Sequence, residues 1–234
     1  MTEWAAKRFW TDVTVTDATG GFGIALDDRP VRTPGKRPLV VPTRAMADMI
    51  AAEWRDQTGT IDPGTMPATR AANSALEKVA PVRAKVAAHL AAYAETDLLC
   101  YRADAPDALV ARQAAAWDPL LDWAREDHGA DLRVTTGVMP VDQPPAALAA
   151  LAAPVHALDP FALAGFHDLV ALSGSLVLAL AVIARRLSPE DAWALSRLDE
   201  VFQIEQWGED EDAAETAEIA RSAFLDAARF YFAA

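Results

Sequence analysis

The sequence predicts an α+β protein that is predominantly helical, with a small β-rich N-terminal domain followed by a helical-bundle C-terminal domain built on a buried central helix. Three observations lead to this fold class. Residues 9–41 are rich in β-branched and turn-forming residues, whereas residues 169–184 form a long uncharged apolar run. The hydrophobic fraction is 52%, largely alanine and leucine, which favours helix and excludes a disordered chain.

The apolar run Leu169–Ala184 indicates the helix around which the rest of the chain packs. It contains no charged residue, and its apolar positions go all the way round a helix, so it must be enclosed. The run is shorter than the roughly 20 residues that span a bilayer, which favours a helix buried in protein. The small residues Ser173, Gly174 and Ser175 would let neighbouring helices approach closely. A membrane-associated protein remains an alternative interpretation.

The first part of the chain is expected to form a small sheet covered by one helix. Val13–Thr16 are β-branched, and further short strands up to Val41 are separated by turn residues. Thr43 is a candidate N-cap, and apolar residues at helical spacing follow it as far as Trp54. These strands need a cover for their apolar face, and the helix supplies it.

The Pro- and Gly-rich stretch Ile61–Pro67 is the candidate domain boundary. We therefore expect residues 1–65 to form the β-rich domain and residues 66–234 to form the helical one. A short strand is also predicted near 132–135. Its return to the N-terminal sheet is an open alternative.

Helix start signals follow the boundary. Thr69 is a candidate N-cap, and Ser188-Pro189-Glu190-Asp191 combines a capping serine, a proline at the first position and acids at the positive end of the dipole. The second signal predicts a single helix that runs from Ser188 to Gly208 on a core stripe of Leu195, Leu198 and Phe202. The acidic run at 209–212 begins the last helix.

Composition limits the classes of function. The formal net charge of −13 and the pI near 4.6 disfavour nucleic-acid binding, because phosphate contacts need clustered Lys and Arg. Cys100 is the only cysteine, which excludes an internal disulfide and suits a reducing compartment. The N-terminus lacks an apolar leader, so we expect a cytoplasmic location without stable membrane insertion.

A catalytic constellation is not evident. The glycines at 20–23 precede a strand rather than a helix, so the logic of a phosphate loop fails. The four histidines are scattered, and Cys100 lies among apolar residues that predict an inert thiol. We therefore predict no catalytic residue, no metal and no cofactor. A hydrolase that uses Ser175 and His167 is the alternative.

The seven tryptophans point instead to protein binding, because tryptophan is a favoured anchor in interfaces. Trp207 lies beside Gln203, Gly208 and an acidic run, a mixed setting that suits an interface. Packing of Trp207 between the last helices is an equal alternative.

Several segments, taken together, resemble one protein family. The most specific is Asp199-Glu200-Val201-Phe202-Gln203-Ile204-Glu205-Gln206-Trp207-Gly208-Glu209, which is similar to a D-E-x-x-Q-x-E-x-W-G-E signature. Supporting segments are Arg8-Phe9-Trp10, Leu26-Asp27-Asp28-Arg29-Pro30 with Thr33-Pro34, Glu53-Trp54 with Gln57, Met66-Pro67, Asp97-Leu98-Leu99-Cys100-Tyr101-Arg102, Trp117-Asp118-Pro119-Leu120-Leu121 and Ser173-Gly174-Ser175-Leu176. In this order they resemble the assembly chaperones of the F-type ATP synthase alpha subunit, found in mitochondria and alphaproteobacteria. Asp28 departs from the family's usual glycine.

The resemblance implies a non-catalytic chaperone that binds the unassembled alpha subunit without ATP. Such a chaperone would prevent aggregation of the alpha subunit and hand it over for assembly with beta. We expect Glu200, Gln203, Glu205 and Trp207 to form the contact surface or its immediate support, because they lie off the core stripe. Trp54 is expected beside them or in the N-terminal core. We also expect a monomer.

Overall fold

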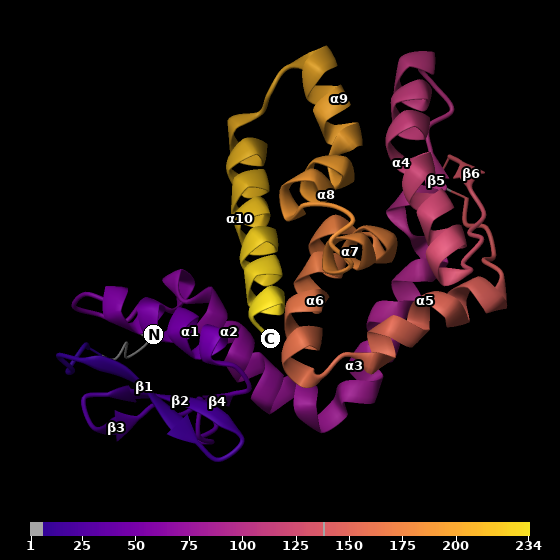
Figure 1. Ribbon diagram of the computed structural model, residues 1–234. Coiled ribbons are helices and arrows are strands. Elements are labelled where there is room, and N and C mark those ends of the chain that lie inside the picture. The colour runs from indigo at the N-terminus through magenta and orange to yellow at the C-terminus, as the bar shows by residue number, and fades with distance from the viewer. Residues whose placement is uncertain (1–6, 138) are drawn as a thin grey trace. The chain divides into compact units, whose positions relative to one another are not determined.

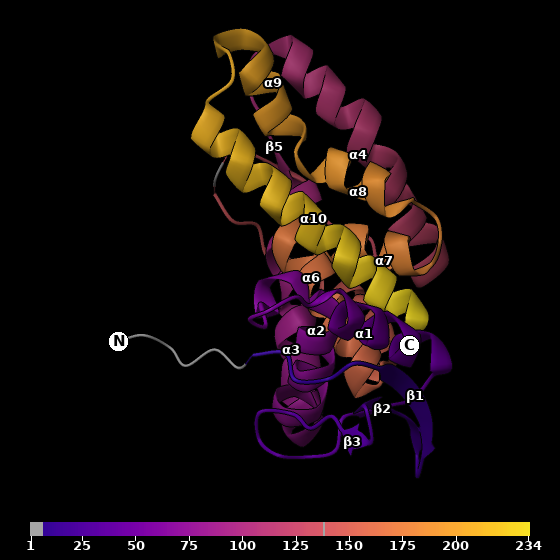
Figure 2. The ribbon, with the colours of Figure 1, turned by 90° about the vertical axis from the view of Figure 1, so that its left-hand side faces the viewer.

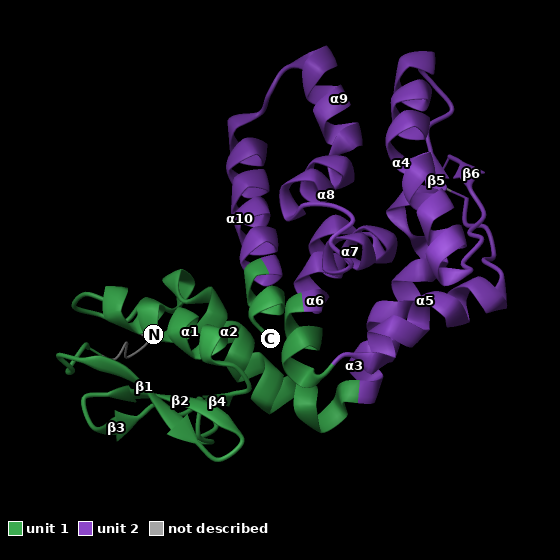
Figure 3. Ribbon diagram, in the orientation of Figure 1, with its two compact units in different colours: residues 1–83, 159–165, 229–234 green, residues 84–158, 166–228 purple. Residues whose placement is uncertain are grey.

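The computed structural model describes residues 7–137 and 139–234 of the chain (Figure 1). Its contacts divide it into two compact units (Figure 3). Unit 1 consists of Met1–Arg83, Asp159–Gly165 and Arg229–Ala234, and unit 2 of Ala84–Leu158 and Phe166–Ala228. The boundary predicted after residue 65 falls inside unit 1 of this division, and two short segments from later in the chain join unit 1.

Unit 1 contains an antiparallel four-stranded sheet in which β2 is central. The strands are β1 (Val13–Ala18), β2 (Gly21–Leu26), β3 (Arg29–Pro30) and β4 (Val40–Val41). The hairpin register pairs Val13 with Leu26 and Ala18 with Gly21. Gly21 has φ +151°, and a Cβ there would lie 2.1 Å from the carbonyl oxygen of Val41, so only glycine lets β4 approach. The positive φ in the turn before β3 belongs to Asp27, not to Asp28.

Helix α1 (Arg44–Asp56) covers this sheet, as the sequence predicts. The hydroxyl of Thr43 accepts a hydrogen bond from the Met46 amide at 3.2 Å, which confirms the N-cap. The buried residues of α1 include Met46 and Ile50. Trp54, near the end of α1, is half-buried and meets the Trp10 ring edge-on, with the ring centroids 5.3 Å apart.

Helix α2 (Pro67–Ser74) follows the short helix η1 (Pro63–Thr65) and continues through η2 (Ala75–Val79) and η3 (Ala80–Val82). The predicted N-cap at Thr69 is wrong. The carboxylate of Glu53 in α1 takes that role: it accepts hydrogen bonds from the amides of Ala68 at 2.6 Å and Thr69 at 2.8 Å, and from the Thr69 hydroxyl at 2.6 Å. A negative charge from another helix thus satisfies the free amides that begin α2.

The rest of the chain is mostly helical, and α3, α6 and α10 contribute residues to both units. The remaining elements in order are α3 (Arg83–Ala91), η4 (Ala92–Thr96), η5 (Leu98–Cys100), β5 (Tyr101–Arg102), α4 (Asp107–His128), β6 (Thr135–Thr136), α5 (Pro145–Ala157), α6 (Pro160–Ser173), α7 (Leu176–Ile183), α8 (Pro189–Ser196), α9 (Leu198–Trp207) and α10 (Glu211–Ala233). The strand expected near 132–135 does not join the N-terminal sheet, because β6 pairs in parallel with β5 within unit 2.

Most of the central apolar run is buried as predicted, although Ala171 and Ala184 are exposed. The run forms two helices, α6 and α7, rather than one. Gly174 has φ +69°, which ends α6, and the hydroxyl of Ser175 caps α7 by accepting from the Leu178 amide at 3.0 Å. All seven residues from Leu176 to Val182 are buried. Within the described part of the chain, none of the helices is long and apolar enough to cross a membrane.

The segment predicted as one helix from Ser188 to Gly208 is also two helices. The start is confirmed, since the Ser188 hydroxyl accepts from the Asp191 amide at 3.0 Å. Arg197, with φ −106° and ψ 15°, leaves helical geometry and separates α8 from α9. Leu198 and Phe202 of α9 are buried. Figure 2 shows α9 beside α4 and next to the start of α10.

Candidate partner-binding surface

Helix α9 is held against α4 by polar contacts along one side. Arg112 of α4 donates to both carboxylate oxygens of Glu205, at 2.9 and 2.8 Å, and its guanidinium lies over the Phe202 ring, 5.2 Å from the centroid. Nearer the start of α9, Gln113 of α4 donates to the Asp199 carboxylate at 2.7 Å. These contacts fix the rotation of α9 about its own axis, so they determine which residues face outward.

The ion pair between Arg112 and Glu205 favours the charged form of each side chain. The hydrogen bond from Arg112 lowers the pKa of Glu205, and the same bond raises the pKa of Arg112. Both side chains are partly solvent-exposed, at 41% and 45%. Solvent therefore screens the pair, which orients α9 more than it stabilises the fold.

The solvent-exposed surface of α9 carries several large apolar side chains. Trp207 is 79% exposed, Val201 44% and Ile204 43%. These residues together with Glu200 and Gln203 form what we call the α9 face. Single exposed apolar residues are common, but several on the outward side of one ten-residue helix are typical of a protein interaction site.

The structure places the predicted site residues in different settings. Glu200, Gln203 and Trp207 are on the α9 face, where Glu200 pairs with Arg197 at 2.8 Å. Glu205 turns instead to Arg112 on α4. Trp54 belongs to unit 1 and packs on Trp10.

Sequence reasoning missed Val201, Ile204 and Arg112. Val201 and Ile204 lie within the recognised signature, but at positions where that signature accepts any residue, so apolar character there was the only available signal. Arg112 is 93 residues from its partner Glu205 in the chain, and no local pattern links the two.

Ser175, one of the two residues considered for a hydrolase, is bonded to the buried carboxylate of Asp97. Asp97 is fully buried and accepts from the Ser175 hydroxyl at 2.7 Å, the Val177 amide at 3.0 Å and the Leu99 amide at 3.0 Å. Burial raises the pKa of Asp97, and these hydrogen bonds oppose that rise. The Ser175 hydroxyl is thus engaged at the start of α7, while His167 is half-exposed and bonded to Asp168 at 2.8 Å.

The chemistry of Cys100 agrees with the expected inert thiol. Burial, reinforced by the nearby charge of Asp97, raises the pKa of Cys100 to about 12, so the reactive thiolate is scarce at neutral pH. Among the described residues, no group of three or more His, Cys, Asp or Glu side chains is arranged to hold a metal ion.

Comparison with known proteins identifies the family of the chain. A family model described as ATP12 chaperone protein matches residues 7–125, just over half of the chain. The chain belongs to the ATP12 family of chaperones. The crystal structure of Atp12 from Paracoccus denitrificans is 54% identical, with a TM-score of 0.94 over 98% of this chain and 99% of that one.

Other ATP12 relatives extend the match over the helical region. A lysine-substituted variant of the Paracoccus protein is 53% identical, with a TM-score of 0.94 over 99% of both chains. The crystal structure of an Agrobacterium tumefaciens protein described as a putative chaperone is 44% identical, with a TM-score of 0.94 over 97% of this chain and 85% of that one. Mitochondrial atp12 of Schizosaccharomyces pombe is 24% identical over 222 residues, which cover 89% of this chain and 76% of the relative.

The predicted family resemblance and fold class are therefore confirmed. At the level of the family, the protein is a chaperone of ATP synthase assembly.

Proposed function

We propose that this ATP12-family protein binds the unassembled alpha subunit of the F-type ATP synthase head, without ATP, and releases it to the beta subunit. The α9 face is the observation that carries the proposal: Val201, Ile204 and Trp207 expose apolar surface on a helix whose rotation is fixed by α4. An alpha subunit without its partner exposes an apolar interface of its own, which aggregates unless it is covered.

Glu200, Gln203, Glu205 and Trp207 have separate roles in this proposal. Glu200 and Gln203 supply polar contacts beside the aromatic anchor Trp207, and Glu205 supports them by holding α9 to Arg112. Trp54 supports unit 1 by packing on Trp10.

The same proposal describes a monomeric, non-catalytic protein of the bacterial cytoplasm that needs no cofactor and does not bind nucleic acid. The net charge of −13 supports the last point, because it repels phosphate. The burial of Ser175 and the thiol pKa of Cys100 support the absence of catalysis by those groups.

The test is light scattering of alpha subunit diluted from denaturant, with and without an equimolar amount of this protein and without nucleotide. We expect suppressed scattering and a co-eluting complex that disappears when beta subunit is added. Unchanged scattering and no complex would reject alpha-subunit binding. If Glu205→Ala and Trp207→Ala both retained full binding, the assignment of the surface to α9 would be wrong.

A further inference from the structure

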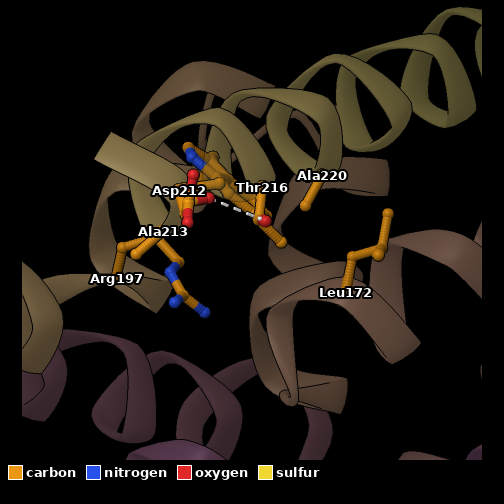
Figure 4. A pocket seen from close by; sticks show the side chains of 8 residues that line it. Leu172, Arg197, Asp212, Ala213, Thr216 and Ala220 are labelled. Carbon is orange, nitrogen blue, oxygen red and sulfur yellow. Dashed lines mark hydrogen bonds between the residues drawn. The ribbon is translucent and has the colours of Figure 1, made fainter. Parts of the chain in front are cut away.

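A groove lies beside the α9 face, between α8 and the first turns of α10. Its volume is about 490 Å³, within the range of roughly 300–1,000 Å³ typical of ligand sites. In Figure 4, Arg197 extends into this hollow and Leu172 lies across it. The side chains that line it are Leu172, Trp193, Arg197, Asp212, Ala213, Thr216, Ala217 and Ala220.

The groove exists because α10 changes from large to small side chains along one side. Farther along the helix, Phe224 is buried and packs against Trp193 with the ring centroids 5.6 Å apart. Towards the start of α10 the same side presents Ala213, Ala217 and Ala220, which cannot reach across to α8. Protein interiors are close-packed, so a hollow of this size with apolar walls is suited to side chains from outside.

The first turns of α10 beside the groove, which we call the acidic rim, are strongly acidic. Residues 208–220 contain six Asp and Glu residues and no Lys or Arg. Of their carboxylates Asp212 lines the groove, and Glu218 pairs with Arg221, which follows this segment. Arg197 is the cation that lines the groove, and it is already paired with Glu200 at 2.8 Å and stacked over Trp193, 5.6 Å from the ring centroid. The pairing with Glu200 joins a residue that lines the groove to a residue of the α9 face.

We propose that this groove receives the apolar side chains of a basic amphipathic segment of the alpha subunit, whose Lys or Arg residues lie along the acidic first turns of α10. The inference rests on the proposed function and specifies the chemistry of the contact. The apolar walls of the groove favour apolar side chains at the centre of the bound segment. The carboxylates of the acidic rim favour Lys or Arg residues on either side of that centre, and they increase the association rate. The occupant then covers the groove and the α9 face together.

Filling the groove tests the proposal directly. Ala217→Trp places an indole in the hollow, and Ser222→Trp, on an exposed position of the same helix, is the matched control. Ala213→Leu is a smaller second filling variant at an exposed position, for use if Ala217→Trp unfolds in circular dichroism. The probes are the intact alpha subunit and overlapping 20-residue synthetic peptides that span its sequence, with binding measured by fluorescence anisotropy.

We expect the wild-type protein to bind peptides with an apolar centre and basic flanks, and filling the groove to raise their Kd at least tenfold while Ser222→Trp leaves it unchanged. Neutralising the rim with Asp212→Asn and Glu215→Gln is expected to raise the Kd about threefold at low salt and to flatten its salt dependence. The control, Asp17→Asn with Asp56→Asn, removes two exposed carboxylates from unit 1.

The outcomes separate the two proposals. If wild-type protein forms no complex with the alpha subunit, the proposed function fails. If the complex forms and the filling variants bind intact subunit and peptides as tightly as wild type, the groove is not the contact and the chaperone proposal stands. Preference for peptides without basic flanks, independent of salt, would overturn the role of the acidic rim.

Discussion

Helices α7 and α9 are short helices of unit 2 that overlap segments carrying the family resemblance, yet their side chains lie in opposite settings. Every residue of α7 from Leu176 to Val182 is buried, and its first amides are bonded by Asp97 and Ser175. In α9 only Leu198 and Phe202 are buried. The first arrangement determines the fold, whereas the second presents a surface, so a family motif by itself does not distinguish a scaffold from a binding site.

The largest expected loss in the free energy of unfolding is that of Asp97→Ala, which removes the buried acceptor at the start of α7. The substitution leaves three donors without an acceptor inside the protein, and breaking such a buried network costs about 3–5 kcal/mol. Because burial raises the pKa of Asp97, the neutral variant Asp97→Asn should cost less. Urea unfolding measures both, with Asp104→Ala as an exposed control within about 0.5 kcal/mol of wild type. Equal stability of all three variants would show that the carboxylate does not hold α7.

A second test of structural contacts is Glu53→Ala in unit 1, which removes the cap at the start of α2. Its carboxylate accepts three hydrogen bonds from Ala68 and Thr69 at the start of α2, so we expect a loss of about 2 kcal/mol in the free energy of unfolding. Asp56→Ala, at an exposed position of the same helix, is the control. If the two variants unfold at the same urea concentration, α2 does not depend on this cap.

Substitutions on the α9 face are expected to weaken binding of the alpha subunit and to leave the free energy of unfolding almost unchanged. Trp207→Ala and Ile204→Ala should change the free energy of unfolding by less than about 0.5 kcal/mol, because both side chains are exposed. Each should raise the Kd for the alpha subunit, Trp207→Ala at least tenfold, or about 1.4 kcal/mol. Val82→Ala, another exposed apolar residue, should alter neither quantity. Unfolding of Trp207→Ala at much lower urea would mean that Trp207 packs rather than binds.

The smallest effect concerns the ion pair that orients α9. The hydrogen bond from Arg112 depresses the pKa of Glu205 below its ordinary 4.5, so the contribution of the pair is complete above that pH and is lost as pH falls through the lower pKa of the folded state. The difference in melting temperature between wild type and Glu205→Gln should therefore be small at pH 7 and shrink as the pH is lowered below 4.5. A difference that grows on acidification would contradict this sign.

Local signals in the sequence were sufficient for several elements. The hydroxyls of Thr43 and Ser188 cap α1 and α8 as predicted, because a cap bonds within the first turn and its signature is contiguous. Most of the apolar run at 169–184, and all of it from Leu176 to Val182, was correctly assigned to the core, because burial follows from composition. The family signature also led to the helix that carries Trp207.

Contacts between distant residues decided the rest. The hydrogen bonding at the start of α7 is completed by Asp97, whose bond to the Ser175 hydroxyl spans 78 positions of the chain. The orientation of Glu205 depends on Arg112, 93 positions away. Periodicity describes a helix only relative to its own axis. Which side faces outward, and where two helices leave a groove, is fixed by the partners that the folded chain brings to them.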